Sequence, residues 1–243
     1  GCLFFFDEAA TTGIYPLSLH DAVPIWQSTM DEASALGSEH LSCYEVIYEE
    51  DTPLYEQLQA GEFDVDEALA CAMYDRLIDT AAAAGFSQYE VANFARHEGE
   101  PDPELPSRAC RHNINYWRGG ACQALGPSAS GFVDGRRIRN VANTERYCEQ
   151  LALGQRAHES VEQLSPLGSA GETAAFGLRM NAGWPFDLFT QVTGHDLRNE
   201  WAGDMQRAVD AGWGEQEAER FHLTREGLRF ADTIAEWFIR LEE

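Results

Sequence analysis

QYEVANFARHEGEPDPELPSRACRHNINYW, residues 88–117, is the segment from which the rest of the chain is best interpreted. It opens with an alternation of apolar and polar residues through Tyr89, Val91 and Phe94, which is typical of a strand with one buried face. An acidic loop with three prolines follows, and proline disfavours both helix and sheet. The segment closes on RHNINYW, residues 111–117, which collects an imidazole, amides and two aromatic rings. A loop that leads from a strand to such a cluster predicts a small-molecule site.

The residues before this segment predict a strand, a helix and a second strand. Helical composition over residues 26–36 precedes a strand over 40–48, and Thr52-Pro53 biases the next loop away from helix. Asp64 and Glu67 resemble a capping box. The helix behind it has one apolar stripe and a glycine C-cap, formed by Leu69, Met73, Leu77, Ala81 and Gly85. With the strand at 86–94, this order predicts a βαβ unit with parallel strands.

The residues after this segment predict a second group of elements. QALGPSASGF, residues 123–132, either lets the backbone approach another group closely or forms a strand with a glycine bend. A short strand over 136–141 carries Arg136, Arg137 and Arg139, which we interpret as protection of a sheet edge. Asn143 is expected to cap a helix that runs to Gly154.

A domain boundary is expected at Ser165-Pro166. Beyond it, Ser169 and Glu172 predict a capping box for a helix through Met180. A helical turn over 186–193, a wing of antiparallel strands over 213–223 and a final helix capped by Thr224 follow. Two apolar stripes mark the helices of this region, formed by Leu197, Trp201, Met205 and Ala208 and by Leu228, Ala231, Ala235 and Phe238. Helices around a wing predict a winged-helix-like module.

The composition excludes several classes of function. The net charge of the 243-residue chain is −24, from 41 acidic residues and 17 basic residues, all of them arginine. Lysine Schiff-base chemistry and a lysine-dependent phosphate loop are therefore excluded. So negative a chain repels phosphate backbones and anionic lipids, so we expect neither nucleic acid nor a membrane surface as a partner. No apolar run is long enough to predict stable membrane insertion.

The six cysteines do not read as a disulfide framework. They contain no C-x-x-C pair, and a chain of this length does not need disulfides to fold. We expect most of them to be small buried residues in a reducing cytosol.

Several motifs in order resemble one protein family. QYEVANFAR at 88–96, RHNINYW at 111–117 and ALGPSASGF at 124–132 resemble the C-terminal half of the coproporphyrinogen III oxidase-like radical SAM proteins, specifically the HemW-like haem chaperones. HLSCYEV at 40–46 and LTREGLRFAD at 223–232 extend the resemblance from about Trp26 to the C-terminus. It implies an α/β fold, with the last repeats of a partial (β/α) radical SAM barrel over residues 26–164. A small helical, winged-helix-like domain of HemN type is then expected over residues 165–243.

Residues 1–25 do not share this resemblance. They lack an initiating Met and a sustained period, and the run from Phe4 through DEAATTGIYPLSLHDAVPI resembles a translated sequencing adapter. We expect a foreign or disordered segment joined to a truncated reading frame. The alternative is an ordinary divergent N-terminus.

The resemblance implies a haem site in residues 111–117, because HemW-like proteins use His-Asn-x-x-Tyr for haem. That motif stands here as His112, Asn113 and Tyr116, with His112 as a candidate ligand of the haem iron. In a helix, His112 and Tyr116 would share one face. Arg111, like Arg118, could pair with a haem propionate or with a nearby carboxylate such as Glu98 or Asp102. Trp117 could stack on a macrocycle or belong to the core.

The resemblance also implies S-adenosylmethionine and a [4Fe-4S] cluster in the full-length family. The family's C-x-x-x-C-x-x-C loop is absent here, so no cysteine is assigned to a cluster, and we expect no radical chemistry from this polypeptide. Two short stretches resemble remnants of the S-adenosylmethionine pocket. They consist of Tyr44, Glu45 and Ile47 and of Gly126, Ser128 and Ser130.

The function implied is that of a cytoplasmic haem chaperone, which binds haem or porphyrin and passes haem to client haemoproteins. An oxygen-independent coproporphyrinogen III dehydrogenase of haem biosynthesis is the alternative, since fold cannot separate the two. A winged-helix nucleic-acid-binding protein is a remote alternative, because residues 165–243 carry fourteen acidic residues and seven arginines, a net charge of 7 − 14 = −7. Open strand edges in an incomplete barrel predict a possible dimer.

Overall fold

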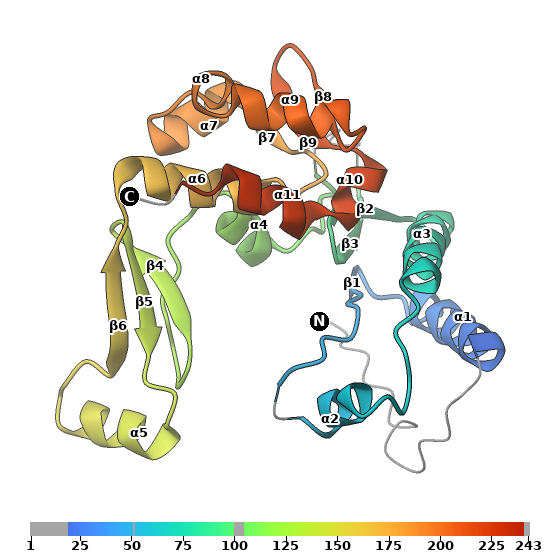
Figure 1. The fold of residues 1–243 in the computed structure, drawn as a ribbon, viewed down its shortest axis with the longest axis horizontal. Helices are drawn as coiled ribbons and strands as arrows, with labels where there is room; N and C mark the ends of the chain where they lie inside the picture. Colours follow the sequence, from blue (N-terminus) through green and yellow to red (C-terminus); the bar gives the residue numbers. More distant parts are fainter. Residues whose placement is uncertain (1–18, 51, 100–104, 241–243) are drawn as a thin grey trace. The chain divides into compact units, whose positions relative to one another are not determined.

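The computed structural model describes residues 19–50, 52–99 and 105–240, in two compact units. The N-terminal unit comprises residues Gly1–Ala109 and the C-terminal unit comprises Cys110–Glu243. Each unit mixes helices with a small sheet or sheets (Figure 1), as the predicted α/β class requires. Within the described residues, no helix combines the length and the apolar character needed to cross a membrane.

The N-terminal unit packs helices against a three-stranded antiparallel sheet. Its strands are β1 (His40–Ser42), β2 (Phe86–Glu90) and β3 (Asn93–Arg96), in the order β1-β3-β2. Its helices are α1 (Leu19–Ala35), α2 (Pro53–Gln59) and α3 (Glu67–Ala83). The buried side chains of α1, α3 and the sheet form one core, which consists of Met30, Ala33, Leu41, Leu77, Ala81, Phe86 and Phe94.

The prediction of a βαβ unit with parallel strands is wrong. The residues predicted as one strand form two, β2 and β3, joined by a turn at Val91 and Ala92. Because β3 folds back onto β2, it takes the place beside β2 that β1 was expected to fill. β1 then pairs antiparallel with β3, with Leu41 opposite Phe94.

The first strand is also shorter than expected. It ends at Ser42 because its partner β3 begins at Asn93, and only the bond from Cys43 N–H to the Ala92 carbonyl continues the pairing. Beyond it, residues 43–49 form neither helix nor strand.

The helices of this unit begin at other residues than predicted. α1 begins at Leu19 rather than Trp26, so seven residues of the expected foreign segment are helical, while residues 1–18 of that segment lie outside the described ranges. α2 was missed, because Pro53 occupies the first turn, where no N–H is needed, and the Thr52 hydroxyl accepts from Tyr55 N–H at 3.3 Å.

α3 is capped by Asp66, whose carboxylate accepts from Leu69 N–H at 2.9 Å, and not by the expected pair of Asp64 and Glu67. Its C-terminal end agrees with the prediction. Gly85 follows the helix with φ +83°, a left-handed conformation that glycine adopts without a Cβ clash.

The first part of the C-terminal unit comprises a short helix and an antiparallel sheet. α4 (Arg111–Trp117) precedes β4 (Ser130–Val133), β5 (Arg136–Asn140) and β6 (His158–Gln163), in the order β4-β5-β6. α5 (Thr144–Ala152) connects β5 to β6. The predicted cap is confirmed, because Asn143 Oδ1 accepts from Arg146 N–H at 2.9 Å.

The interpretation of the arginines on β5 as edge protection is wrong, because β5 is the central strand. The side chains instead pair across the sheet. Arg137 bonds Glu162 on β6 at 2.8 Å and Glu172 at 2.6 Å, and Arg139 lies 3.8 Å from Glu159. The pairs with Glu162 and Glu159 are exposed, so each adds little to stability.

The second part of the C-terminal unit is a helical layer with a three-stranded wing. Its helices are α6 (Pro166–Gly177), α7 (Phe186–Thr193), α8 (Leu197–Glu200), α9 (Ala202–Asp210), α10 (Arg225–Arg229) and α11 (Ala231–Phe238). The wing contains β7 (Trp184–Pro185), β8 (Gly214–Gln216) and β9 (Arg220–Leu223), in the order β7-β9-β8. The predicted wing, helical turn 186–193 and Thr224 cap are all confirmed.

The start of α6 differs from the prediction. Ser165, not Ser169, caps the helix, and its hydroxyl accepts from Gly168 N–H at 3.1 Å. Pro166 occupies the first turn, as in α2. The four apolar residues predicted to form a stripe before Gly212 are all buried, although the helix is interrupted at Trp201.

Candidate functional site

The predicted haem motif lies on α4, which confirms that this segment is helical. The helix starts with the bond from Ile114 N–H to the Cys110 carbonyl at 3.1 Å. It ends at Gly119, which has φ +73° and donates to the Tyr116 carbonyl at 3.1 Å. A side chain at Gly119 would meet Thr173 of α6 at 2.9 Å, so glycine is needed both for the turn and for the close approach of α6.

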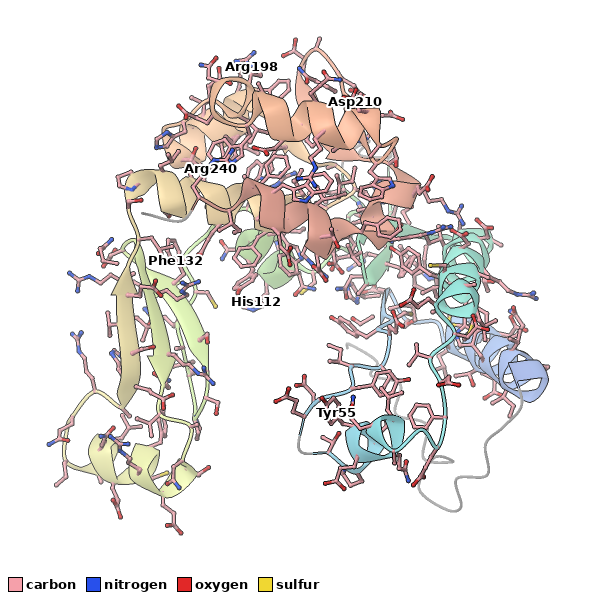
Figure 2. All side chains as sticks on the ribbon, viewed as in Figure 1. Tyr55, His112, Phe132, Arg198, Asp210 and Arg240 are labelled. Atoms are coloured by element: carbon pink, nitrogen blue, oxygen red, sulfur yellow. The ribbon has the colours of Figure 1, made fainter. Side chains whose placement is uncertain are left out.

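The helical geometry places His112 and Tyr116 on one face, four residues apart. His112 is exposed, and it can be seen on α4 in Figure 2. Tyr116 retains 37% of its surface. Asn113 is half-buried and Arg111 is exposed. An exposed imidazole one helical turn from an exposed phenol offers two groups that can each ligate haem iron.

Three aromatic side chains join α4 to α6. The Tyr116 ring lies 5.7 Å from the Phe176 ring and 5.2 Å from the Trp117 ring, centroid to centroid. Trp117 is half-buried, and its ring lies 6.3 Å from that of Phe176. Trp117 therefore supports the surface, while Tyr116 and Phe176 form it. The role of Phe176 was missed, because it lies 60 residues after Tyr116 and no local pattern links them.

The two arginines that flank the motif have different environments. Arg118 donates to the Gly183 carbonyl at 2.5 Å and stacks over Trp184, 4.7 Å from the ring centroid. Both contacts hold Arg118 against the segment Gly183–Trp184. Of the two carboxylates considered, Glu98 bonds Arg108, whereas Asp102 lies outside the described residues. Arg111 forms no ion pair with a described carboxylate.

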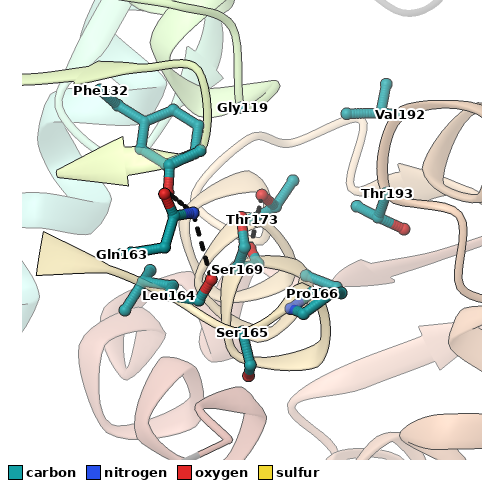
Figure 3. Close-up of a pocket in the computed structure, with 12 residues that line it drawn as sticks. Gly119, Phe132, Gln163, Leu164, Ser165, Pro166, Ser169, Thr173, Val192 and Thr193 are labelled. Carbon is teal, nitrogen blue, oxygen red and sulfur yellow. Dashed lines mark hydrogen bonds between the residues drawn. The ribbon is translucent and has the colours of Figure 1, made fainter.

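A cleft of about 480 Å³ opens beside α6 in the same unit, and no predicted site residue lines it. Its lining includes Ser165, Ser169 and Thr173, which follow one another at a spacing of four residues and are labelled in Figure 3. That spacing is the sequence signal that could have indicated this cleft. Two of these hydroxyls are used locally, since Ser165 caps α6 and Thr173 donates to the Ser169 carbonyl at 2.9 Å.

The first stretch resembling an S-adenosylmethionine pocket is exposed. Tyr44 retains 64% and Ile47 75% of their surface, and Glu45 is also exposed. The Tyr44 hydroxyl lies 3.5 Å from the amide of Asn93.

The second such stretch, in the C-terminal unit, is held by its own chain. Asn140 donates to the Gly126 carbonyl at 2.9 Å, and Gly126 N–H donates to the Tyr147 hydroxyl at 3.1 Å. Ser128 has φ +60°, and Ser130 begins β4. The small residues do allow the backbone to approach another group closely, as expected, but that group is a neighbouring segment of the same chain. A Cβ on Gly131 would lie 2.6 Å from Ala124 N.

The described residues do not supply the donor set of an iron–sulfur cluster. Nowhere in the described ranges do three His, Cys, Asp or Glu side chains converge as metal ligands. The five described cysteines form no disulfide; four are half-buried and Cys148 is exposed, so they are less buried than expected. Burial raises the pKa of Cys43 to about 11, which keeps it a neutral thiol.

The comparison with known families matches the C-terminal region. The family model of the HemN C-terminal domain matches residues 164–230. This range begins one residue before the Ser165 cap of α6 and includes Phe176.

Curated relatives extend the likeness across most of the chain. The heme chaperone HemW of Mycobacterium tuberculosis is 29% identical over 210 residues, which are 85% of this chain and 49% of the relative. The HemW of Synechocystis sp. is 32% identical over 161 residues, 65% of this chain and 37% of the relative. The chain thus spans at most about half the length of these relatives.

A solved structure shares the fold. The coproporphyrinogen III oxidase HemN of Escherichia coli, described as a radical SAM enzyme, superposes with a TM-score of 0.64 at 14% identity. The superposition covers 88% of this chain and 51% of that protein. The family model, the relatives and this fold confirm the resemblance drawn from the motifs.

Proposed function

We propose that this chain, a HemW-like and HemN-like C-terminal region of the radical SAM family, binds haem at α4 and passes it to client haemoproteins. The relatives named as heme chaperones support the haem-binding part of the proposal. The likeness to coproporphyrinogen III oxidase shows only that the two proteins share a fold, so it does not favour the oxidase activity.

The single observation that carries the proposal is the exposure of His112 and Tyr116 on one face of α4. A histidine or tyrosine with a purely structural role is usually buried or hydrogen-bonded to a neighbouring residue. Here an imidazole and a phenol are both accessible, and either group can ligate haem iron. Tyr116 also contacts Phe176, which gives the apolar macrocycle a surface beside the iron ligand.

The radical SAM cofactors do not enter this proposal. The family implies S-adenosylmethionine and a cluster, but the described residues offer no ligand set for a cluster. We therefore derive no reaction step through either group. Haem is the cargo here, and what this chain contributes is an iron ligand and an aromatic surface.

The test is a haem titration of the full 243-residue chain, followed by the Soret absorbance. We expect a saturable spectral shift in the wild type and its loss in His112→Ala. His195→Ala is the matched control, because His195 is a half-buried histidine of the same unit outside the motif. Equal binding by the wild type and His112→Ala would remove His112 from the site. Transfer is tested by mixing the haem-loaded chain with an apo-globin, and haem that stays on the chain would contradict a chaperone role.

A further inference from the structure

An arginine with an unsatisfied buried N–H group lies just after α6, near the motif. Arg179 follows α6 and retains 21% of its side-chain surface. Its guanidinium lies 5.2 Å from the centroid of the Trp117 ring, and it bonds Asp232 of α11 through Nη1. Its Nε is buried and has no hydrogen-bond partner among the described residues. A buried donor without an acceptor is costly, and a shift of the side chain that let an incoming anion reach Nε would relieve that cost.

This arginine belongs to the same cluster as the aromatic surface. Trp117 contacts both Arg179 and the ring of Phe176, and Phe176 contacts Tyr116. Phe176 retains 38% of its surface although it is a phenylalanine in a helix of mostly buried residues. From α4 to the end of α6, the phenol of Tyr116, the exposed ring of Phe176 and the guanidinium of Arg179 thus belong to one cluster.

We propose that Phe176 and Arg179 form a second half of the porphyrin site, in which Phe176 contacts the macrocycle and Arg179 binds a propionate. This inference rests on the proposed function, and it extends the site from α4 into the HemN C-terminal domain. A dicarboxylic porphyrin fits the chemistry, because its flat apolar ring needs aromatic contact and its carboxylates need a guanidinium. The Arg179 guanidinium beside an exposed aromatic surface favours an anionic ligand at this place, although the net charge of −24 over the whole chain opposes anions in general.

Asp232 regulates this half of the site. Its carboxylate is 88% exposed and holds the Arg179 guanidinium in the absence of ligand. A propionate must therefore compete with Asp232 for Arg179. Removal of the Asp232 charge should make Arg179 more available and tighten binding.

The test compares three ligands on the full chain, haem, metal-free protoporphyrin IX and its dimethyl ester, measured by absorbance and by quenching of tryptophan fluorescence. We expect Phe176→Leu to weaken all three ligands by about fivefold to tenfold, since stacking of flat rings does not depend on iron. Arg179→Gln should weaken the two dicarboxylates by about tenfold and leave the diester unchanged. Asp232→Asn should tighten the dicarboxylates only.

Two controls separate this inference from the proposed function. His112→Ala should weaken haem but not metal-free protoporphyrin, because only haem offers iron to a ligand. Arg198→Gln is the matched arginine control, since Arg198 also pairs with an aspartate and lies over a ring, 5.0 Å from the centroid of Phe186. It should change no affinity.

The outcomes are distinct. If wild type binds haem through His112 while Phe176→Leu and Arg179→Gln, shown by circular dichroism to be folded, bind every ligand as wild type does, the inference is overturned and the proposed function stands. An equal loss of the diester and the dicarboxylates in Arg179→Gln would contradict a propionate contact. If the folded wild type binds no porphyrin, both proposals fail.

Discussion

Trp184 donates its indole N–H to the main-chain carbonyl of Ala174 at 3.1 Å, and both residues are fully buried. This bond ties β7 of the wing to α6, the helix that carries Phe176. The Trp184 ring also stacks edge-to-face on Phe189, 5.1 Å between centroids, and Phe189 in turn contacts Trp201. The aromatic core of the C-terminal unit is therefore built around one ring whose only polar atom is bonded.

Gly177→Ala should destabilise this core. A Cβ at Gly177 would lie 2.1 Å from Nε1 of Trp184, in a fully packed environment, and overpacking of this kind costs about 1–3 kcal/mol or more. Gly203→Ala is the control, because Gly203 is helical and no atom lies within 4 Å of its Cβ position. Gly203→Ala should raise the free energy of unfolding by about 0.5–1 kcal/mol. Urea unfolding followed by tryptophan fluorescence checks both, and equal midpoints would contradict the packing described.

His112→Ala should leave stability unchanged, within about 0.5 kcal/mol of the wild type, because the side chain is exposed. Phe189→Ala removes a fully buried ring and should lower the free energy of unfolding by about 3–5 kcal/mol. Thermal unfolding of both variants checks this. A large loss in His112→Ala would mean that the motif is structural, and it would undermine the haem titration as a test of binding.

Cys43 should resist alkylation in the folded chain. Burial raises its pKa to about 11, so very little thiolate is present near pH 8, and its surface is partly covered. Cys148 is exposed and should react first with iodoacetamide. Mass spectrometry of peptides over a time course at pH 8, with and without urea, gives the order. Labelling of Cys43 as fast as Cys148 in the absence of urea would contradict the burial.

Acid should weaken the N-terminal unit through His40. Burial lowers the pKa of His40 below 6.5, while its Nε2 lies 2.8 Å from the Tyr89 hydroxyl. The unfolded state therefore binds the proton more tightly, so the stabilisation is complete above about pH 6.5 and is lost as the pH falls below it. His40→Gln should show a shallower fall in unfolding free energy between pH 7.5 and pH 5, by circular dichroism. Parallel curves for the two proteins would refute the assignment to His40.

Local patterns predicted those elements whose ends are determined by nearby residues. Asn143 and Thr224 cap their helices as predicted, because a cap depends only on the side chain and the next three N–H groups. The wing and the buried stripe through Trp201 were also predicted. The caps at Asp66 and Ser165 were predicted two and four residues away, at Asp64 and Ser169, since several acceptors compete near each helix start.

The sequence by itself determined the motif, the absence of lysine and the family resemblance, because these depend on residue identity and order alone. Only the tertiary structure decided that β3 separates β1 from β2, since the pairing of β1 with β3 joins residues more than 50 positions apart, such as Leu41 and Phe94. It also decided that Phe176 and Arg179 adjoin Tyr116 and Trp117. Contacts between residues 60 positions apart follow from the packing of α4 on α6, and no local period in the sequence records that packing.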